Sequence, residues 1–512
     1  MGRLAVRLGS AVSAVVCAVA GVAAVAQGAA AATAAPVTIP ALQRWTPGTG
    51  AFTFGMDSRV VARTGDQRQA AAVLAADLRA LTGVPISSWV GVQIRPGDIE
   101  LRIGPAEGGS EGYRVVVGAS LVVQGGTHAG VFNGTRTVLQ WLRQGWTVPA
   151  GTAADWPVYP ERGLLVDVGR QFFSVEWLRA RIRELSYLKL NLLHLHLSDR
   201  FGFRLAGETH PEIVSPQHYT KREIADLIAY AASYGVRIMP EIDFPGHADA
   251  ILVSHPELKL VSRTGVVDHG AIDLSKPAAY DLIADVMGEF LPLFPDPQWH
   301  VGADEYVTNY DDYPQLAAYA KVHYGANATG KDTYYGFINW ANGIVRAAGK
   351  TARIANDGLK PGGATIAVDS DIIVDHWSQN GFAGFPWSGD AYTGKQLIAA
   401  GHRVVNASFT PTYYTTGGPA AMFNAPPSAM YDLWHPDVFV DGSRLDSTER
   451  AANLGSKVSL WCDDPNAATE AELATVLHPR LRVLAQLTWG SPKPLLYSAF
   501  LPVMHTVGAA PA

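Results

Sequence analysis

The chain has 512 residues, of which 48% are hydrophobic and 17% are charged, and its formal net charge is -6. This length suits two or three domains with a large buried core rather than one small domain. The acidic balance and the lack of a basic run argue against nucleic acid as a partner.

The first 35 residues differ in composition from the rest of the chain. Arg3 and Arg7 precede a long Ala/Val-rich stretch that ends in small residues. This pattern is typical of a bacterial secretory signal, so we predict that residues 1–35 are a signal peptide and that the protein is secreted. A transmembrane anchor is the alternative, but the stretch is only weakly apolar. Cys17 lies in this segment and Cys462 would then stand alone, so no intrachain disulfide is expected.

Residues 36–157 are predicted to form a small α/β domain. Residues 69–83 and 130–142 repeat apolar side chains at helical spacing, whereas residues 111–126 alternate and turn like a β-hairpin. No reactive groups gather in this region, so we do not expect it to hold the functional site.

Residues 158–500 alternate between short apolar runs and amphipathic segments, and residues 501–512 are interpreted as a C-terminal tail. The strand-like runs lie at 163–169, 191–199, 236–243, 298–305, 352–358, 371–377, 402–409 and 457–464. Most are followed by apolar residues at three- and four-residue steps, which indicates helices. Eight such units predict an α/β fold in which a (β/α)8 TIM barrel follows the small N-terminal domain. An open doubly wound sheet is the alternative, but no glycine-rich phosphate loop follows the first strand.

Polar and aromatic residues cluster where the predicted strands end, which is where barrel enzymes carry their active sites. These residues are Asp199, His247, His300, Asp304, Glu305, Trp377, Tyr413, Trp461 and Asp463, and Arg162 lies just before the first strand. A single strand-end acid is more often a helix cap, and His194 and His196 fit barrel-interior histidines better than metal ligands. The repetition at nearly every strand end favours an active site. The long 408–443 loop is rich in aromatic residues and is predicted to be functional.

The residue types indicate a carbohydrate site. Trp and Tyr match the apolar faces of a sugar ring, and Asp, Arg and His match its hydroxyl groups. Glycoside cleavage needs a proton donor and an anion, for which Asp304 and Glu305 are the candidates. Neighbouring side chains on a strand diverge, so the two acids are not expected to flank one bond as acid and nucleophile. The pair fits better if Glu305 donates the proton and a 2-acetamido oxygen of the substrate, oriented by Asp304, attacks.

Three blocks of the sequence resemble glycoside hydrolase family 20, the β-N-acetylhexosaminidases and lacto-N-biosidases. They are residues 161–199, "MPEIDFPGHADAIL" and "WHVGADE", in the family's order. The resemblance covers about residues 161–490, and residues 111–142 resemble the family's small N-terminal domain. It implies release of a terminal β-linked N-acetylhexosamine by substrate-assisted, retaining hydrolysis through an oxazolinium intermediate, without a cofactor or a metal.

The resemblance also implies roles for individual residues. Glu305 would be the general acid/base, Asp304 would polarise the acetamide, and Tyr413 would bind the acetamide oxygen. His247 and Asp199 would form a polar relay that tunes the acid. The expected substrate-binding residues are Arg162 at the ring hydroxyls, Trp377 and Trp461 as pocket walls, Asp463 and His300.

Departures from the family pattern leave other interpretations open. Gly302-Ala303 replaces the usual Gly-Gly, Ala355-Asn356 stands where a pocket Trp is common, and the Tyr413 segment lacks a common acid. A wider pocket would admit a disaccharide, as in lacto-N-biosidases, which is the second interpretation.

Two further classes are a non-catalytic glycan-binding barrel and a metal-dependent hydrolase that uses His194 and His196. The presence of both acids argues against the first, and the acid spacing does not complete a metal site for the second. The expected partner is an oligosaccharide or glycoconjugate substrate, with no nucleic acid and no stable membrane association.

Overall fold

The computed structural model describes residues 34–378 and 391–512. The signal peptide predicted for residues 1–35 therefore lies almost wholly outside the described residues. Residues Ala34–Ala512 form one compact unit, which contains an N-terminal sheet and a closed barrel. Over the described ranges, none of the helices combines the length and apolar character that crossing a bilayer requires.

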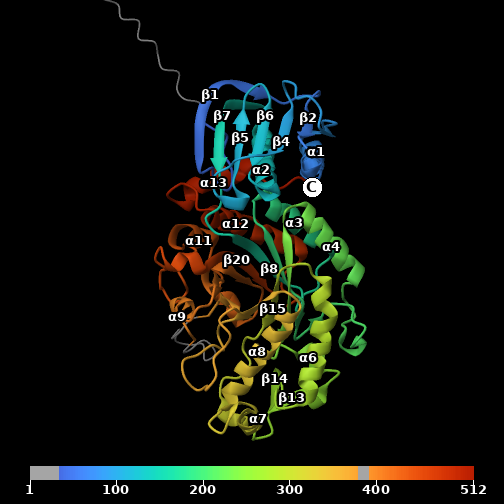
Figure 1. Cartoon of the computed structure of the whole chain (residues 1–512), viewed down its shortest axis with the longest axis vertical. Helices are drawn as coiled ribbons and strands as arrows, with labels where there is room; N and C mark the ends of the chain where they lie inside the picture. Colours follow the sequence, from blue (N-terminus) through green and yellow to red (C-terminus); the bar gives the residue numbers. More distant parts are fainter. Residues whose placement is uncertain (1–33, 379–390) are drawn as a thin grey trace, which may run out of the picture. The chain divides into compact units, whose positions relative to one another are not determined.

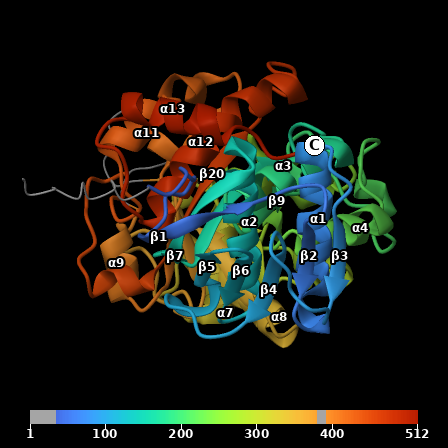
Figure 2. The same cartoon turned by 90° about the horizontal axis from the view of Figure 1, so that it is seen from above.

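The N-terminal part is a seven-stranded mixed sheet in the order β1-β7-β5-β6-β4-β2-β3, which runs from left to right in Figure 2. Its strands are β1 (Arg44–Thr53), β2 (Arg59–Ala62), β3 (Ser87–Val90), β4 (Ile99–Ile103), β5 (Tyr113–Val117), β6 (Leu121–Gly125) and β7 (Thr147–Asp155). Helices α1 (Arg68–Thr82) and α2 (His128–Gln144) pack against each other and against the sheet. The two predicted helices and the predicted β5–β6 hairpin are therefore present.

The rest of the chain forms a closed barrel of eight parallel strands, as predicted. They are β8 (Glu161–Asp167), β9 (Leu192–His196), β12 (Arg237–Phe244), β15 (Gln298–Gly302), β16 (Thr351–Ala355), β17 (Ile373–His376), β18 (Val404–Asn406) and β20 (Asn453–Trp461). The ring closes because β20 pairs with both β18 and β8. Every active-site candidate that follows a strand is thereby brought to one end of the barrel.

Helices follow six of the eight strands (Figure 1), and all of them except the six-residue α9 are long. They are α3 (Val175–Tyr187), α4 (Lys221–Ser233), α6 (Pro277–Phe290), α8 (Gly330–Ala347), α9 (Gly394–Ala399) and α12 (Glu470–Trp489). No helix lies among residues 356–372, between β16 and β17, all of which are described. The 408–443 loop replaces the helix after β18 with the short elements α10 (Phe409–Thr412), β19 (Tyr413–Thr415) and α11 (Pro427–Leu433).

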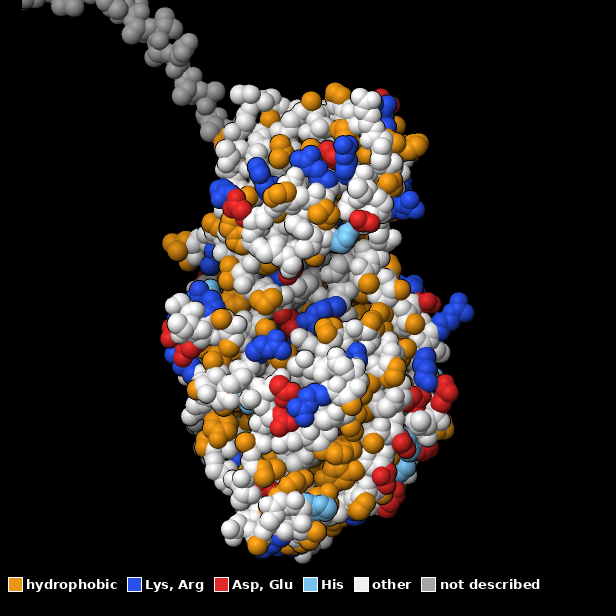
Figure 3. Space-filling view, viewed as in Figure 1, with side chains coloured by type: hydrophobic (Ala, Val, Ile, Leu, Met, Phe, Trp, Pro, Cys, Tyr) orange, Lys and Arg blue, Asp and Glu red, His pale blue; other side chains and the backbone are white. Residues whose placement is uncertain are grey.

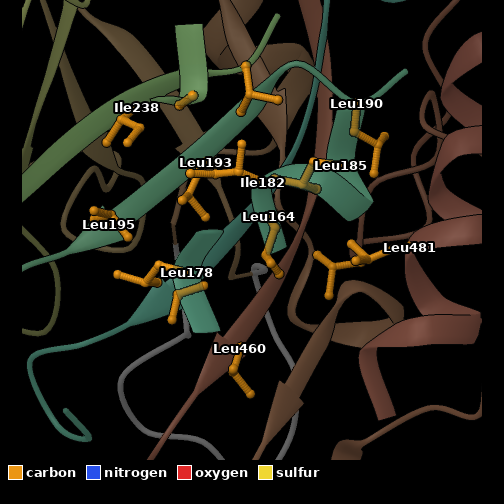
Figure 4. Close-up of a cluster of buried hydrophobic side chains, with 14 of the residues drawn as sticks. Leu164, Leu178, Ile182, Leu185, Leu190, Leu193, Leu195, Ile238, Leu460 and Leu481 are labelled. Atoms are coloured by element: carbon orange, nitrogen blue, oxygen red, sulfur yellow. The ribbon is translucent and has the colours of Figure 1, made fainter. Parts of the chain in front are cut away.

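The hydrophobic core between strands and helices is formed by side chains that repeat every two residues in the strands and about every 3.6 residues in the helices (Figure 4). On β9, Leu193 and Leu195 face the helical layer, where Leu178 and Ile182 of α3 are also buried. The alternate β9 residues point to the other face of the strand, as a period of two requires. Histidines at those positions therefore lie inside the barrel, as the sequence predicts.

The C-terminal tail predicted for residues 501–512 is wrong in part, because helix α13 (Tyr497–Val507) runs across the predicted boundary. Met504 and Val507 of this helix are buried, and the Tyr187 hydroxyl donates to the Val507 carbonyl at 2.7 Å. Apolar residues at spacings of three and four continue past residue 500, and they pack as one helix face.

Candidate active site

The acid pair lies on a strained turn that follows β15. Gly302, Ala303 and Glu305 have φ angles of 80°, 65° and 49°, a region that costs a non-glycine residue about 1–3 kcal/mol. The Oδ1 atom of Asp243 fixes the turn: it accepts the Ala303 N–H at 3.1 Å, and a Cβ on Gly302 would lie 1.8 Å from it. Because the backbone leaves the extended conformation here, Asp304 and Glu305 line the same pocket instead of diverging.

His247 lies between the acid pair and the buried carboxylate of Asp199. Its Nε2 is 3.4 Å from Glu305 Oε2 and 3.6 Å from Asp304 Oδ2, and its Nδ1 is 3.6 Å from Asp199 Oδ2. Asp199 Oδ2 also lies 2.9 Å from Nε2 of the interior His196. This places the predicted relay residues Asp199 and His247 in line with Glu305.

The charges of this relay decide where its proton resides. Burial lowers the pKa of His247, but the carboxylates of Asp199 and Asp304 outweigh burial and raise it well above the usual value. Burial raises the pKa of Glu305, but the adjacent His247 more than compensates, so the pKa is lowered. Without substrate, the proton of the pair therefore resides on His247 beside an ionised Glu305.

Asp357, after β16, is a further carboxyl beside the acid pair and was not among the predicted site residues. Its Oδ2 accepts the Glu305 N–H at 2.8 Å, and its Oδ1 accepts the Trp377 indole N–H at 3.1 Å. It therefore holds both the strained backbone of Glu305 and one wall of the pocket. Burial and the charges of Asp304 and Glu305 raise the pKa of Asp357 to about 7.

We expect the Tm of Asp357→Asn minus that of the wild type to be larger at pH 8 than at pH 4. The folded pKa of about 7 lies above the value of about 3.9 for an unfolded aspartate, so folding favours the neutral carboxyl. The wild type loses this stabilisation as the pH rises from about 4 through about 7, whereas asparagine does not ionise. Thermal unfolding of both proteins across this range measures the effect. A Tm difference that does not change with pH would contradict it.

Arg170 lines the pocket, and the prediction for Arg162 is wrong. Arg162 is fully buried at the amino end of β8, where its guanidinium donates to the carbonyls of Tyr159 and Lys189 and pairs with Glu111. A residue at that end of a barrel strand cannot reach a site at the carboxyl end. Its position at the start of the strand already indicated this.

Arg170 follows β8 at the carboxyl end and lines the pocket. Its guanidinium nitrogens lie 2.9 Å from Asp199, 3.0 Å from Asp167 and 3.9 Å from Asp463. Two of these contacts hold the side chain between buried carboxylates. The longer contact leaves Arg170 and Asp463 free to bind a ligand together.

His300 also lies outside the pocket, contrary to the prediction. It points into the barrel, where its Nδ1 is 2.9 Å from Glu241 and its Nε2 is 3.4 Å from Asp375. Glu241 also faces His194 and His196 at 3.0 and 2.9 Å. His300 therefore belongs to a buried network of ionic side chains beneath the site, because its position along β15 turns it inward.

Aromatic rings form the walls of the pocket. Trp377 and Tyr413 stack with ring centroids 6.3 Å apart, and Tyr413 and Trp461 are tilted at 5.9 Å. Asn356, at the position where the resemblance led us to expect a pocket Trp, is fully buried and accepts the Trp377 backbone N–H at 2.8 Å. It supports a wall of the pocket and does not form one.

The pocket has a volume of ≈ 520 Å³ and extends well beyond the acid pair. Besides the residues described above, its lining includes Arg200, Thr308, Phe409, Thr415, Gly418, Pro419, Ala420, Phe423 and Asn424. Most of these come from the 408–443 loop, which therefore contributes directly to the pocket. The site combines two neighbouring carboxyls, a histidine beside them and aromatic walls, and it is open enough for a ligand larger than a single small group.

Comparison with protein families agrees with this geometry. The model of the glycosyl hydrolase family 20 catalytic domain matches residues 159–492, and the model of the family's domain 2 matches residues 35–156. The chain belongs to glycosyl hydrolase family 20. The acid pair, the relay and the aromatic walls all lie within the part that matches the family's catalytic domain.

Two curated relatives and one solved structure show how this member compares with the family. The chain is 32% identical to a lacto-N-biosidase of Bifidobacterium bifidum over 467 residues, which are 90% of this chain but 40% of that protein. It is 27% identical to a β-N-acetylhexosaminidase of Cellulomonas fimi, with 90% of each chain covered. The structure of a family 20 exo-β-N-acetylglucosaminidase from Vibrio harveyi superimposes with a TM-score of 0.74 at 23% identity, covering 93% of this chain and 79% of that one. At 23% identity, the similarity to the Vibrio harveyi structure shows a shared fold and no more.

Proposed function

We propose that this protein is a β-N-acetylhexosaminidase that removes a terminal β-linked N-acetylglucosamine or N-acetylgalactosamine with retention of configuration. The observation that carries the proposal is the turn after β15, which directs Asp304 and Glu305 into one aromatic-walled pocket next to His247. Both carboxylates lie within 3.6 Å of the same His247 nitrogen, on one side of the pocket, and this arrangement suits a substrate that supplies its own nucleophile.

In the first step, Glu305 protonates the glycosidic oxygen while the substrate's 2-acetamido oxygen attacks the anomeric carbon. The C–O bond to the leaving group breaks, and a cyclic oxazolinium forms. Asp304 accepts a hydrogen bond from the acetamide N–H and offsets the positive charge that develops on it. The Tyr413 hydroxyl donates to the acetamide oxygen and orients it for attack.

In the second step, water attacks the anomeric carbon from the side that the leaving group vacated. Glu305 takes the water's proton, the oxazolinium ring opens, and the acetamide is restored. Glu305 thus acts first as an acid and then as a base. The proton that rests on His247 at 3.4 Å is available to Glu305 when a bound sugar excludes water from the carboxylate.

We expect Arg170→Gln to lower kcat/KM by about 10- to 100-fold, because hydrogen bonds from a charged group contribute about 1.5–3 kcal/mol. The loss reflects both contacts to ring hydroxyls and the support that Arg170 gives to Asp199 at 2.9 Å. Steady-state kinetics with a chromogenic β-N-acetylglucosaminide measures it.

Arg162→Gln is the matched control for that experiment. Its guanidinium is buried away from the pocket and pairs with Glu111, so we expect it to lower the free energy of unfolding by about 3–5 kcal/mol with KM unchanged. If Arg162→Gln raised KM and Arg170→Gln did not, the assignment of Arg170 to the pocket would be wrong.

Release of a disaccharide is the second candidate function. It is favoured by the pocket lining, which continues past Trp377 to Phe409, Phe423 and Asn424 of the 408–443 loop. It is also favoured by the 32% identity to a protein named lacto-N-biosidase. A second sugar ring on the non-reducing side of the N-acetylhexosamine would lie against this aromatic part of the pocket.

A defined glycan ending in galactosyl-β-N-acetylglucosamine distinguishes the two functions. Disaccharide as the first product supports the second candidate. The first candidate is supported if this glycan is not cleaved and the same glycan without its terminal galactose releases N-acetylglucosamine. Absence of turnover on both glycans and on a chromogenic substrate, with binding retained, would favour the non-catalytic glycan-binding alternative.

We also propose that the N-terminal segment directs export of the protein and is removed from the exported form. The proposal rests on the composition of residues 1–35. Expression in a bacterial host that secretes proteins, followed by N-terminal sequencing of the protein in the medium, tests it. Full-length protein retained in the cells would contradict it.

A further inference from the structure

Two histidines and two carboxylates on the loops that follow β11 (Gly202–Phe203) and β12 gather next to a carboxylate of helix α6. This histidine–carboxylate cluster consists of His210, Glu212, His255, Glu257 and Asp285. Figure 3 shows acidic and histidine side chains close together on the flank where Figure 1 places α6. None of the five residues lines the active-site pocket.

The inner part of the cluster presents three ligand atoms to one point. Glu212 Oε1 lies 2.8 Å from His210 Nδ1 and 3.0 Å from His255 Nε2, and all three atoms lie within 4.8 Å of one another. Tetrahedral zinc with bonds of about 2.0–2.2 Å places its ligand atoms about 3.3 Å apart. A small outward movement of these side chains would therefore admit the ion.

The outer part of the cluster has the arrangement that supports metal-binding histidines. His210 Nε2 lies 3.3 Å from Asp285 Oδ2, and His255 Nδ1 lies 3.2 Å from Glu257 Oε1. Each histidine thus uses one ring nitrogen toward Glu212 and the other toward a separate carboxylate. A carboxylate behind each imidazole fixes the ring's orientation and makes the inner nitrogen a stronger donor.

The charges of the cluster also favour a cation. Three carboxylates face two histidines, so an excess of negative charge remains even if both rings are protonated. In the barrel interior, by contrast, the grouping of His194 and Glu241 already has the Lys457 ammonium 2.7 Å from His194. The side chains of His210 and His255 are 19% exposed, so an ion can reach the cluster from solvent.

We propose that this cluster binds one Zn²⁺ through His210 Nδ1, Glu212 Oε1 and His255 Nε2, with water as the fourth ligand. Imidazole and carboxylate donors at an exposed site suit zinc among the divalent ions. The ion joins the connection between β9 and α4, which also contains Asp199, to the connection between β12 and α6, which also contains His247. The Ser254 hydroxyl already links the two segments by donating to the Glu212 carbonyl at 2.7 Å. The zinc stabilises the loops of the relay and takes no part in the chemistry.

Isothermal titration of ZnCl₂ into tag-free, EDTA-treated and dialysed enzyme tests the proposal. We expect one equivalent of zinc to bind, and the Tm to rise by about 2–3 °C at a zinc concentration about 100-fold above Kd. His210→Ala and His255→Ala are expected to lose both effects. Asp285→Asn is expected to weaken binding by about 10- to 100-fold. His505→Ala, at an exposed position on α13, is the matched control and should bind like the wild type.

The proposal is overturned if the wild type binds no zinc, or if both histidine variants keep the full stoichiometry, which would place the ion elsewhere. Glu212→Gln preserves the size of the side chain and removes the anionic ligand, so it replaces the alanine variants if they fail to fold. Because zinc binding and Tm are measured directly, the result does not depend on the proposed glycosidase activity.

Discussion

The Glu305→Gln variant is expected to lose about 10³-fold in kcat toward glycosides with poor leaving groups, and to bind substrate almost as well as the wild type. General acid–base catalysis contributes about 10²- to 10⁴-fold, and glutamine has the size of glutamate but no acidic proton to transfer. The backbone at Glu305 stays in place, because Asp357 accepts its N–H at 2.8 Å. Steady-state kinetics, with thermal unfolding as a check on folding, measures the effect.

The control for Glu305 is how the cleavage rate of the variant depends on the leaving group of the substrate. An aryl glycoside with an acidic phenol needs little protonation, so its bond should break at a rate closer to that of the wild type. Opening of the oxazolinium by water then becomes limiting, and added azide, which needs no base, should restore turnover. A variant with near-normal kcat on an alkyl glycoside would refute the role of Glu305.

The Asp304→Asn variant is expected to lose about 10²- to 10³-fold in kcat, which is the usual cost of removing one preorganised electrostatic group. A carboxylate at the acetamide N–H makes the carbonyl oxygen a better nucleophile and offsets the charge of the oxazolinium. An asparagine amide has no net charge, and one of its rotamers presents a donor to that N–H. Binding of a thiazoline that mimics the oxazolinium should weaken more than binding of N-acetylglucosamine, because only the former resembles the charged species.

Two further measurements decide whether Asp304 acts through the substrate's amide. A β-glucoside, which lacks the 2-acetamido group, should be cleaved by neither the wild type nor the variant. NMR of the first product should show the β-anomer. Cleavage of the glucoside, an α-anomer as the first product, or failure of the thiazoline to inhibit the wild type would each contradict the substrate-assisted mechanism.

The sequence by itself was sufficient for the architecture and for the acid pair. Barrel strands and their helices bury continuous apolar faces, so the periods of two and of about 3.6 residues are visible in the chain. Eight such units allow few arrangements, and the barrel rule then places strand-end side chains such as His247 and Trp377 at one end. Asp304 and Glu305 stood out because two adjacent acids after a buried strand have no structural reason to be there.

The tertiary structure alone decided which polar side chains reach the pocket. Arg162 lies at the start of β8 and Arg170 lies just past its carboxyl end, eight positions later. Only the direction of the strand separates the buried arginine from the one that lines the site. His300 is turned into the barrel by its position on β15, and Asp357 reaches Glu305 across 52 residues of sequence. Side-chain direction and contacts between distant segments leave no local pattern, because they depend on how the strands close into a ring. The left-handed turn at Gly302, Ala303 and Glu305 also leaves no local sequence pattern, because Asp243 of another strand holds it.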